Sequence, residues 1–235
     1  MTVQRSPWAN RGWPVGTFLA RLPITDRRIL LDLGVHRSHP AGDTLIRQGA
    51  AGDAVLVLLD SVVAVTAGVE NGAETLVAIR VSGDIIGEMA VLDNTTRFAS
   101  VTACRRSLIS HVAGSAFMEF LHQHPSAAVA MNQLLGERLR QANRRRLDFT
   151  GYDVDVRLAR ALIELAGQHG HRLAGATDVG VRLSHAEYGA LIGANKDSVQ
   201  RALRQLSARG LVETGRRKVL ILNLTELANF ADIAQ

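Results

Sequence analysis

The sequence predicts an α+β protein, with an N-terminal antiparallel β-roll of the jelly-roll type, one long helix and a C-terminal helix-turn-helix followed by a β-hairpin. Three observations predict this order. Short apolar runs alternate with glycine-bearing turns over residues 36–112, which is typical of sandwiches and barrels. Residues 127–149 hold no helix breaker except Gly136. Residues 183–222 read as two short helices and then two strands. We therefore expect three segments, residues 14–125, 126–150 and 151–235.

The positive charge is concentrated near the C-terminus. The 235 residues carry a formal net charge of +5, yet residues 1–135 hold 11 Lys and Arg against 11 Asp and Glu. Residues 182–218 hold 8 Lys and Arg against 3 Asp and Glu, including both lysines of the chain, Lys196 and Lys218. A local basic patch of this kind is the electrostatic footprint of a nucleic-acid-binding protein.

The rest of the composition narrows the class of protein. Cys104 is the only cysteine, which excludes an intramolecular disulfide framework and a site built from several thiolates. No apolar run is long enough to cross a bilayer, and residues 1–14 lack an apolar signal core. We expect a cytoplasmic protein with no membrane partner, and a disordered tail around Trp8 and Trp13.

The N-terminal segment is expected to start with a helix over residues 13–33, because apolar residues recur there at helical spacing. Short strands should follow, and Asn71-Gly72 is the strongest hairpin signal among the turns between them. The expected strands are residues 44–46, 54–59, 62–67, 75–81, 101–104 and 108–112.

Residues 115–149 are expected to be helical, with Pro125 separating a short helix from a long one of about 35 Å. Ala128, Leu135, Ala142 and Phe149 recur every seven residues, and Met131 takes one of the intervening seam positions. Arg138 and Arg145 occupy the other such positions, so the coiled-coil pattern is partial. We expect one face of this helix to pack on the β-roll and another to pack against a second copy of the chain.

The stretch from Leu183 to Leu206 has the pattern of a helix-turn-helix. Ser184 and Glu187 form a capping box, Gly193 ends the first helix, and Asn195 can cap the second. Such a second helix lies in the DNA major groove and contacts bases with its N-terminal residues. A plain helical hairpin with a solvated polar face is the alternative. The residues left facing outward are Lys196, Asp197, Ser198, Gln200, Arg201 and Arg204.

A β-hairpin is expected after this motif, with strands over residues 211–214 and 219–222. Its turn carries Arg216, Arg217 and Lys218. A hairpin in this place is a wing, and a basic tip can contact phosphate, which gives affinity without sequence information. Helices are also expected over residues 156–168 and 224–233, with a loop or short strand over 170–181.

Residues 83–101 are a candidate ligand site. Gly87 permits a close backbone approach, Arg97 can donate two hydrogen bonds to one phosphate, and Glu88 can accept from a sugar hydroxyl. The amides at the start of a short helix over residues 88–92 can face an anion. These groups suit a ligand with both phosphate and ribose. The alternative is that Glu88 and Arg97 simply pair with each other.

Taken together, the β-roll, the sequence Gly87-Glu88-Met89-Ala90 followed by Arg97-Phe98-Ala99-Ser100-Val101, the long helix and the winged helix-turn-helix resemble the Crp/Fnr family of bacterial transcription regulators. The resemblance covers nearly all of the chain after about Trp13. In that family the Gly-Glu pair holds the ribose and phosphate of a cyclic nucleotide, and the arginine holds the cyclic phosphate. The resemblance implies these roles for Gly87, Glu88 and Arg97.

Three positions depart from the cyclic-AMP-binding members. Phe98 stands where a small residue such as Ser usually contacts the phosphate. Ala142-Asn143 stands where a Thr followed by Ser or Asn usually faces the adenine. Asp60-Ser61 replaces a common glycine. Losing one hydrogen-bonding partner costs about 1–3 kcal/mol, so these changes imply weaker cyclic AMP binding or a different ligand.

The second helix of the motif also resembles the family's recognition helix. Arg201 matches the arginine that contacts guanine, an interaction that is bidentate. Asp197 replaces the usual Glu and is one methylene shorter, and Ser198 suits a phosphate contact. The expected DNA-binding residues are Ser184, Asn195, Lys196, Asp197, Ser198, Gln200, Arg201, Arg204, Arg216, Arg217 and Lys218.

We therefore expect a homodimeric, sequence-specific DNA-binding transcription regulator that is not an enzyme. A roughly palindromic operator is its expected partner, with RNA polymerase a further one, and cyclic AMP or cyclic GMP the expected effector. The alternative is a ligand-independent regulator whose degenerate pocket is plugged by Phe98. A cupin-like metal enzyme lacks the required histidine pattern, and the pairs 36/39 and 122/124 are expected to be surface histidines, so no metal site is expected.

Overall fold

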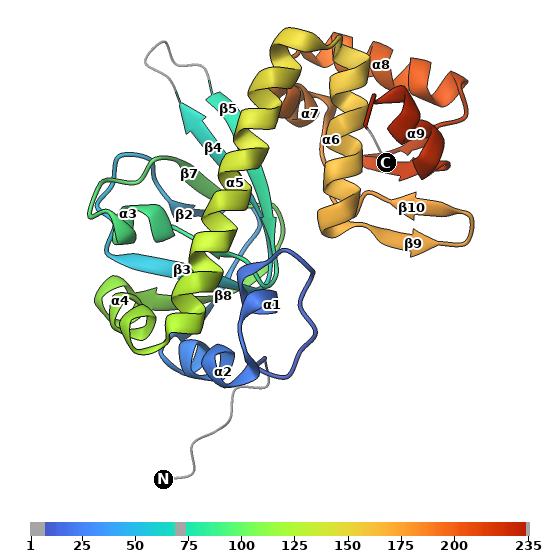
Figure 1. Cartoon of the computed structure of the whole chain (residues 1–235). Coiled ribbons are helices and arrows are strands. Elements are labelled where there is room, and N and C mark those ends of the chain that lie inside the picture. The colour runs from blue at the N-terminus through green and yellow to red at the C-terminus, as the bar shows by residue number, and fades with distance from the viewer. Residues whose placement is uncertain (1–7, 69–73, 234–235) are drawn as a thin grey trace. The chain divides into compact units, whose positions relative to one another are not determined.

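The computed structural model describes residues 8–68 and 74–233, and its contacts divide the chain into two compact units, Met1–Arg138 and Leu139–Gln235. Each unit is described by itself (Figure 1). The predicted turn at Asn71-Gly72 lies outside the described residues. The strands that flank it pair up to Gly68 and Glu74, as a hairpin requires. Across the described residues, the antiparallel sheets, the long helix and the helix-turn-helix confirm the predicted α+β fold.

The start of the chain differs from the prediction in two ways. Two short helices, α1 (Phe18–Arg21) and α2 (Ile24–Asp32), replace the single one expected over residues 13–33. Pro23 separates them, because proline cannot continue a helix that precedes it. The segment around Trp13 is also folded rather than disordered. Trp13 is buried in the core, and Arg11 lies over the rings of both Trp8 and Trp13.

The β-roll consists of two antiparallel sheets with the strand orders β1-β8-β3-β6 and β2-β7-β4-β5. Apolar side chains from both sheets, among them Leu56, Val63 and Ile109, form one core cluster between them. The strands are β1 (Val35–His39), β2 (Thr44–Ile46), β3 (Ala54–Asp60), β4 (Val62–Gly68), β5 (Glu74–Val81), β6 (Ile85–Ile86), β7 (Ser100–Ala103) and β8 (Ser107–Ala113). A short helix, α3 (Glu88–Leu92), follows β6.

Strand β3 shows how a second core is attached to this roll. Leu56 and Leu58 pack between the two sheets, whereas Val55, Val57 and Leu59 pack in a cluster with residues of the helices. Successive strand residues point to opposite faces, so an uninterrupted apolar run serves both cores. The helices that cover this face are α1, α2, α4 (Gly114–Gln123) and the first half of α5 (Pro125–Gly151).

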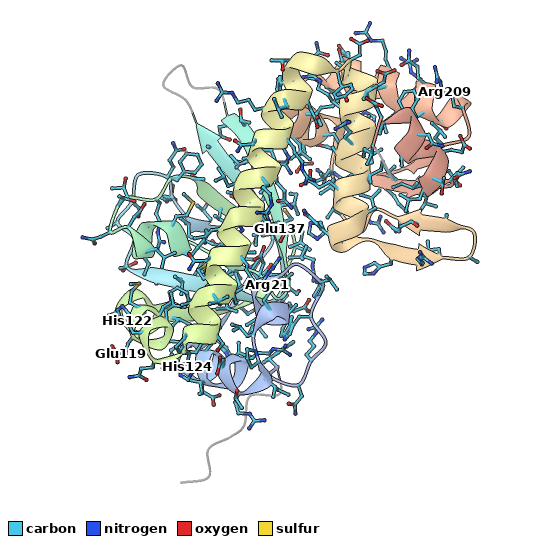
Figure 2. The ribbon with its side chains drawn as sticks, in the orientation of Figure 1. Arg21, Glu119, His122, His124, Glu137 and Arg209 are labelled. Carbon is cyan, nitrogen blue, oxygen red and sulfur yellow. The ribbon has the colours of Figure 1, made fainter. Side chains whose placement is uncertain are left out.

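Helix α5 is buried only on the face that meets the β-roll. Ala127, Ala130, Met131 and Leu134 are buried there. Polar contacts fix its first half to the N-terminal helices, since Arg21 of α1 bonds Glu137 (Figure 2) and Ser126 donates a hydrogen bond to Asp26 of α2. Farther along the helix, Leu139 and Leu147 are strongly exposed.

The second unit contains α6 (Val154–His169), α7 (His185–Ile192), α8 (Lys196–Ala208) and α9 (Leu224–Phe230) around a small antiparallel sheet. Its strand order is β11-β12-β10-β9, with β9 (His171–Leu173), β10 (Ala176–Asp178), β11 (Val212–Gly215) and β12 (Lys218–Ile221). Strands β11 and β12 are the predicted wing. Residues 170–181, predicted as a loop or short strand, contain two short strands, β9 and β10, which extend the sheet of the wing.

The caps of the helix-turn-helix are confirmed. Ser184 and Glu187 make both hydrogen bonds of the capping box, and the side chain of Asn195 accepts from the backbone N–H of Ser198. Gly193 ends α7 with φ of 61°. A Cβ at Gly193 would lie 1.5 Å from Cζ of Phe149, so the last turn of α5 packs directly on this turn.

This packing predicts the effect of Gly193→Ala. Alanine strains the left-handed backbone by about 1–2 kcal/mol, and it also displaces the Phe149 ring. Gly210→Ala is the matched control, because Gly210 has φ of 70° and open space where a Cβ would stand. We expect Gly193→Ala to lower the free energy of unfolding by more than Gly210→Ala does, as measured by urea denaturation. In a Phe149→Ala background the two costs should become equal, and a persistent difference there would contradict this explanation.

Candidate functional site

The predicted ligand site is organised around Gly87, which links β6 to α3. Gly87 has φ of 80°, and a Cβ there would lie 2.5 Å from Nη1 of Arg97. Both the left-handed backbone and the close approach of the guanidinium therefore require glycine. The structure thus brings Gly87, Glu88 and Arg97 together from two different segments of the roll.

Arg97 points inward and is only 7% exposed. Its Nη1 donates to the carbonyl of Gly87 at 2.6 Å, and its Nη2 donates to the carbonyl of Ala54 at 2.6 Å. Asp53 lies 3.8 Å from Nη2. Burial lowers the pKa of Arg97 below its usual value, and the carboxylates of Asp53 and Glu88 oppose that shift. A buried cation held in place by backbone carbonyls is a preorganised partner for an anion.

Glu88 pairs with Arg138 of α5, a partner that the sequence analysis did not identify. Nη1 of Arg138 donates to Oε1 of Glu88 at 2.6 Å, and its Nη2 donates to Oδ1 of Asp84 at 2.7 Å and to the carbonyl of Ile85 at 2.9 Å. Burial alone would lower the pKa of Arg138, but Asp84 and Glu88 together raise it. The alternative in which Glu88 and Arg97 form the ion pair is therefore wrong about the partner. One feature of the sequence could have indicated this pairing. Arg138 is a charged residue at a position of α5 where the seven-residue pattern calls for an apolar one.

The structure corrects the expected role of Phe98. Its side chain is 62% exposed, so it does not plug the pocket. Arg97 and Ala99 are buried on either side of it, and Phe98 lies in the bend that precedes β7, where its side chain faces outward. Ala90 is buried against Gly52, where a Cβ would lie 2.5 Å from Cβ of Ala90, while Met89 is half exposed. Ala142 and Asn143 belong to the second unit, and their contact with a ligand stays a prediction.

The second candidate surface is the outer face of α8 and the wing. Most of the predicted contact residues of α8 are exposed, and Arg201 is held by a hydrogen bond from its Nη2 to Oγ of Ser198 at 3.1 Å. The exposed residues are Asn195, Lys196, Asp197, Gln200, Arg201 and Arg204. A groove of about 450 Å³ separates α7 and α8 from the wing, and Ser184, His185 and Lys196 contribute to its walls.

Two carboxylates partly offset the positive charge of the wing. Lys218 lies 3.6 Å from Oδ2 of Asp178, and Arg217 lies 3.8 Å from Oε2 of Glu187. Burial would raise the pKa of Asp178, but hydrogen bonds from Gly180 and Arg182 and the charge of Lys218 lower it overall. Arg216 is exposed at the turn of the hairpin. The wing therefore presents basic groups that are positioned by carboxylates behind them.

Two family models match the chain over these same units. The cyclic nucleotide-binding domain matches residues 36–124, and the Crp-like helix-turn-helix domain matches residues 156–230. The chain belongs to the Crp/Fnr family of transcription regulators. This Crp/Fnr protein is therefore a DNA-binding transcription regulator with a cyclic nucleotide-binding domain, and not an enzyme.

Related proteins agree with this membership. The chain is 28% identical over 192 residues to a CRP-like cAMP-activated global transcriptional regulator of Mycobacterium tuberculosis, with 82% of this chain and 86% of that protein covered. It is 22% identical over 188 residues to the cAMP-activated global transcriptional regulator CRP of Salmonella typhimurium, with 80% and 89% covered.

Two solved structures share the fold. FixK2 of Bradyrhizobium japonicum superposes with a TM-score of 0.74 at 19% identity, covering 86% of this chain and 99% of that one. The c-di-GMP responsive global regulator CLP of Xanthomonas campestris superposes with a TM-score of 0.72 at 19% identity, covering 86% of this chain and 100% of that one. Among the residues described here, no helix has the length and apolar character needed to span a membrane.

The pairing of Arg138 predicts a large effect on stability. Arg138→Leu leaves Glu88 buried without its cation and removes the closer of two cations from Asp84, which also pairs with Arg80 at 3.5 Å. The free energy of unfolding should fall by about 3–5 kcal/mol. Arg140→Leu changes an exposed arginine of the same helix, and should shift stability by only about 0.5 kcal/mol. Urea denaturation of both variants measures the difference, and equal effects would contradict the assigned role of Arg138.

Proposed function

We propose that the β-roll binds a cyclic nucleotide, with cyclic AMP as the first candidate. The observation that supports this most is the buried group formed by Gly87, Glu88 and Arg97 inside the matched cyclic nucleotide-binding domain. The relatives from Mycobacterium tuberculosis and Salmonella typhimurium are named as cAMP-activated regulators, which favours cyclic AMP over cyclic GMP.

The internal hydrogen bonds of this site leave further donor and acceptor groups for a ligand. The guanidinium of Arg97 has further N–H donors besides the two that bond Gly87 and Ala54. Arg138 contacts Oε1 of Glu88, so Oε2 can accept from a ribose hydroxyl. A nucleotide can therefore add its phosphate and ribose to the existing network without removing either charged partner.

A ligand-independent regulator is the second candidate. The observation that favours it is that Glu88 and Asp84 are already paired with Arg138, and Asp84 also with Arg80 at 3.5 Å, so the domain needs no ligand to satisfy these buried charges. Because Phe98 is exposed, it does not support a plugged pocket. It still has no hydroxyl that could bond a phosphate, which is consistent with this second candidate.

Calorimetric titration of cyclic AMP and cyclic GMP into the purified chain tests this proposal. We expect micromolar binding of one of them, and loss of that binding in Arg97→Ala. Arg105→Ala is the control, because Arg105 is an exposed arginine paired with Asp60 and does not belong to the site. If neither nucleotide binds while the chain still binds DNA, the ligand-independent candidate is correct.

We further propose that two copies pair through the exposed stripe of α5 and bind a roughly palindromic operator in the cytoplasm, where RNA polymerase is the expected partner of a transcription regulator. Leu139 and Ala142 are exposed and lie three residues apart, and Leu135 lies four residues before Leu139, which is the four-and-three spacing of a coiled-coil seam. Phe149 lies seven residues after Ala142 and continues the repeat at the end of the helix. Leu139 is 63% exposed, which is unfavourable for an apolar side chain unless a second helix covers it.

Leu139→Glu should therefore yield a monomer, because a carboxylate in the seam loses its hydration. Leu147→Glu is the matched control, since Leu147 is 69% exposed on the same helix and lies outside the seam spacing. Sedimentation velocity measures the mass of each variant. Fluorescence anisotropy with a palindromic DNA should show at least tenfold weaker binding for Leu139→Glu only. A dimer that survives Leu139→Glu would overturn the proposed interface.

A further inference from the structure

Two histidines of the β-roll face each other outside the nucleotide site. Nε2 of His39 lies 3.0 Å from Nε2 of His111, and the two rings stack with centroids 5.2 Å apart. Nδ1 of His39 lies 2.7 Å from Oδ2 of Asp43. None of these residues has a part in the ligand site or in the DNA-binding surface.

The sheets hold the backbone of all three residues in place, with His39 opposite Ser107 and His111 opposite Val35 in the β1–β8 register. His39 ends the edge strand β1, and His111 lies in β8, which pairs with β1 on one side and with β3 on the other. Asp43 follows in the turn before β2, and two backbone hydrogen bonds with Ala103 of 2.7 and 2.9 Å anchor that turn. The positions are thus set by the sheets and not by mobile surface chain.

Asp43 determines which nitrogen of His39 is free. Its carboxylate can only accept, so Nδ1 of His39 carries the proton and Nε2 presents a lone pair. The N–H of Nε2 on His111 then donates to that lone pair. A carboxylate bonded to the far nitrogen of a histidine is the arrangement that metal-binding histidines use to fix ring orientation and tautomer.

The distance between the two Nε2 atoms suits one metal ion. Metal–imidazole bonds are about 2.0–2.1 Å, so nitrogens 3.0 Å apart subtend an angle of about 95° at the metal. That angle matches neighbouring positions of a square-planar or octahedral ion, as Cu²⁺ and Ni²⁺ prefer. Tetrahedral Zn²⁺ requires the nitrogens to move apart by about 0.3 Å.

We propose that His39 and His111 bind one divalent transition-metal ion, Cu²⁺ or Ni²⁺ in preference to Zn²⁺, through their two Nε2 atoms, with Asp43 orienting His39. Among the described residues no three His, Cys, Asp or Glu side chains are placed to share a metal ion, so water completes the coordination. Binding requires the proton of His111 to move from Nε2 to Nδ1, and it releases no proton overall.

The surroundings contain one favourable and one opposing feature. Burial, together with His39 and Arg37, lowers the pKa of His111 to about 4, so this imidazole is neutral at neutral pH. The positive charge of Arg37 disfavours binding of a metal ion at this place. The carboxylate of Asp43 is partly exposed and balances that charge.

The test is calorimetric titration of Ni²⁺ into the full, untagged chain. We expect one equivalent to bind to the wild-type protein, and binding to weaken at least a hundredfold in His39→Gln and in His111→Gln. Asp43→Asn should weaken it by about tenfold to a hundredfold. His36→Gln and His122→Gln are the controls, because they remove exposed histidines of the same unit and should leave the affinity unchanged.

Spectroscopy and stability supply independent readouts. Electron paramagnetic resonance of the Cu²⁺-loaded chain should show coupling to two imidazole nitrogens, and to fewer in His111→Gln. Ni²⁺ should raise the melting temperature of the wild type only, because the metal joins β1 to β8 in the folded state. Mg²⁺ should not raise the melting temperature, since it prefers oxygen ligands. Wild-type Ni²⁺ affinity in a folded His39→Gln or His111→Gln variant overturns the proposal.

Discussion

The buried ion pairs of Arg138 are the interaction on which the nucleotide-binding domain depends. Glu88 and Asp84 lie in the chain around Gly87, where burial of two carboxylates is unfavourable unless a cation and hydrogen bonds compensate them. Arg138 supplies that cation from α5, and the backbone N–H of Ile85 donates a further hydrogen bond of 2.9 Å to Asp84. The geometry of the loop is thus set by a residue of the long helix. Gly87 lies in this anchored loop, and Arg97 donates a hydrogen bond to its carbonyl.

This arrangement separates two properties of the site. The charged groups of the site are already paired within the domain, so the proposed contacts to phosphate and ribose do not depend on the base. Under that proposal, discrimination between nucleotides falls to residues outside this network, and Ala142-Asn143 on the helix are the predicted ones. Because a missing hydrogen-bond donor changes affinity by about one to two powers of ten, a change at one or two such positions would decide which nucleotide is effective.

The parts of this fold that depend on neighbouring residues could be predicted from the sequence. The parts that depend on pairs of residues far apart in the sequence could not. The capping box at Ser184, the end of α7 at Gly193 and the wing all depend on residues within a few positions of each other, and each was confirmed. Arg138 and Glu88 are 50 residues apart, and no local pattern connects them. The expected plug at Phe98 was wrong because the chain bends there before β7, so that Arg97 and Ala99 are buried and the side chain between them faces outward.

Helix α5 joins the two functions covalently. Arg138, which anchors the nucleotide loop, is the last residue of the first unit. Within the second unit, Asp148 near the end of the same helix pairs with Arg160 at 3.0 Å, and Phe149 packs on Gly193 between the two helices of the DNA-binding motif. One helix therefore carries the ligand anchor at one point and a contact with the DNA-binding turn at another. A ligand can bias DNA binding only by its differential affinity for two states of the protein. Under the proposed function, the contacts available to express that difference are those of Arg138 with Glu88, Asp84 and the carbonyl of Ile85, because they connect the loop around Gly87 to the helix that carries Phe149.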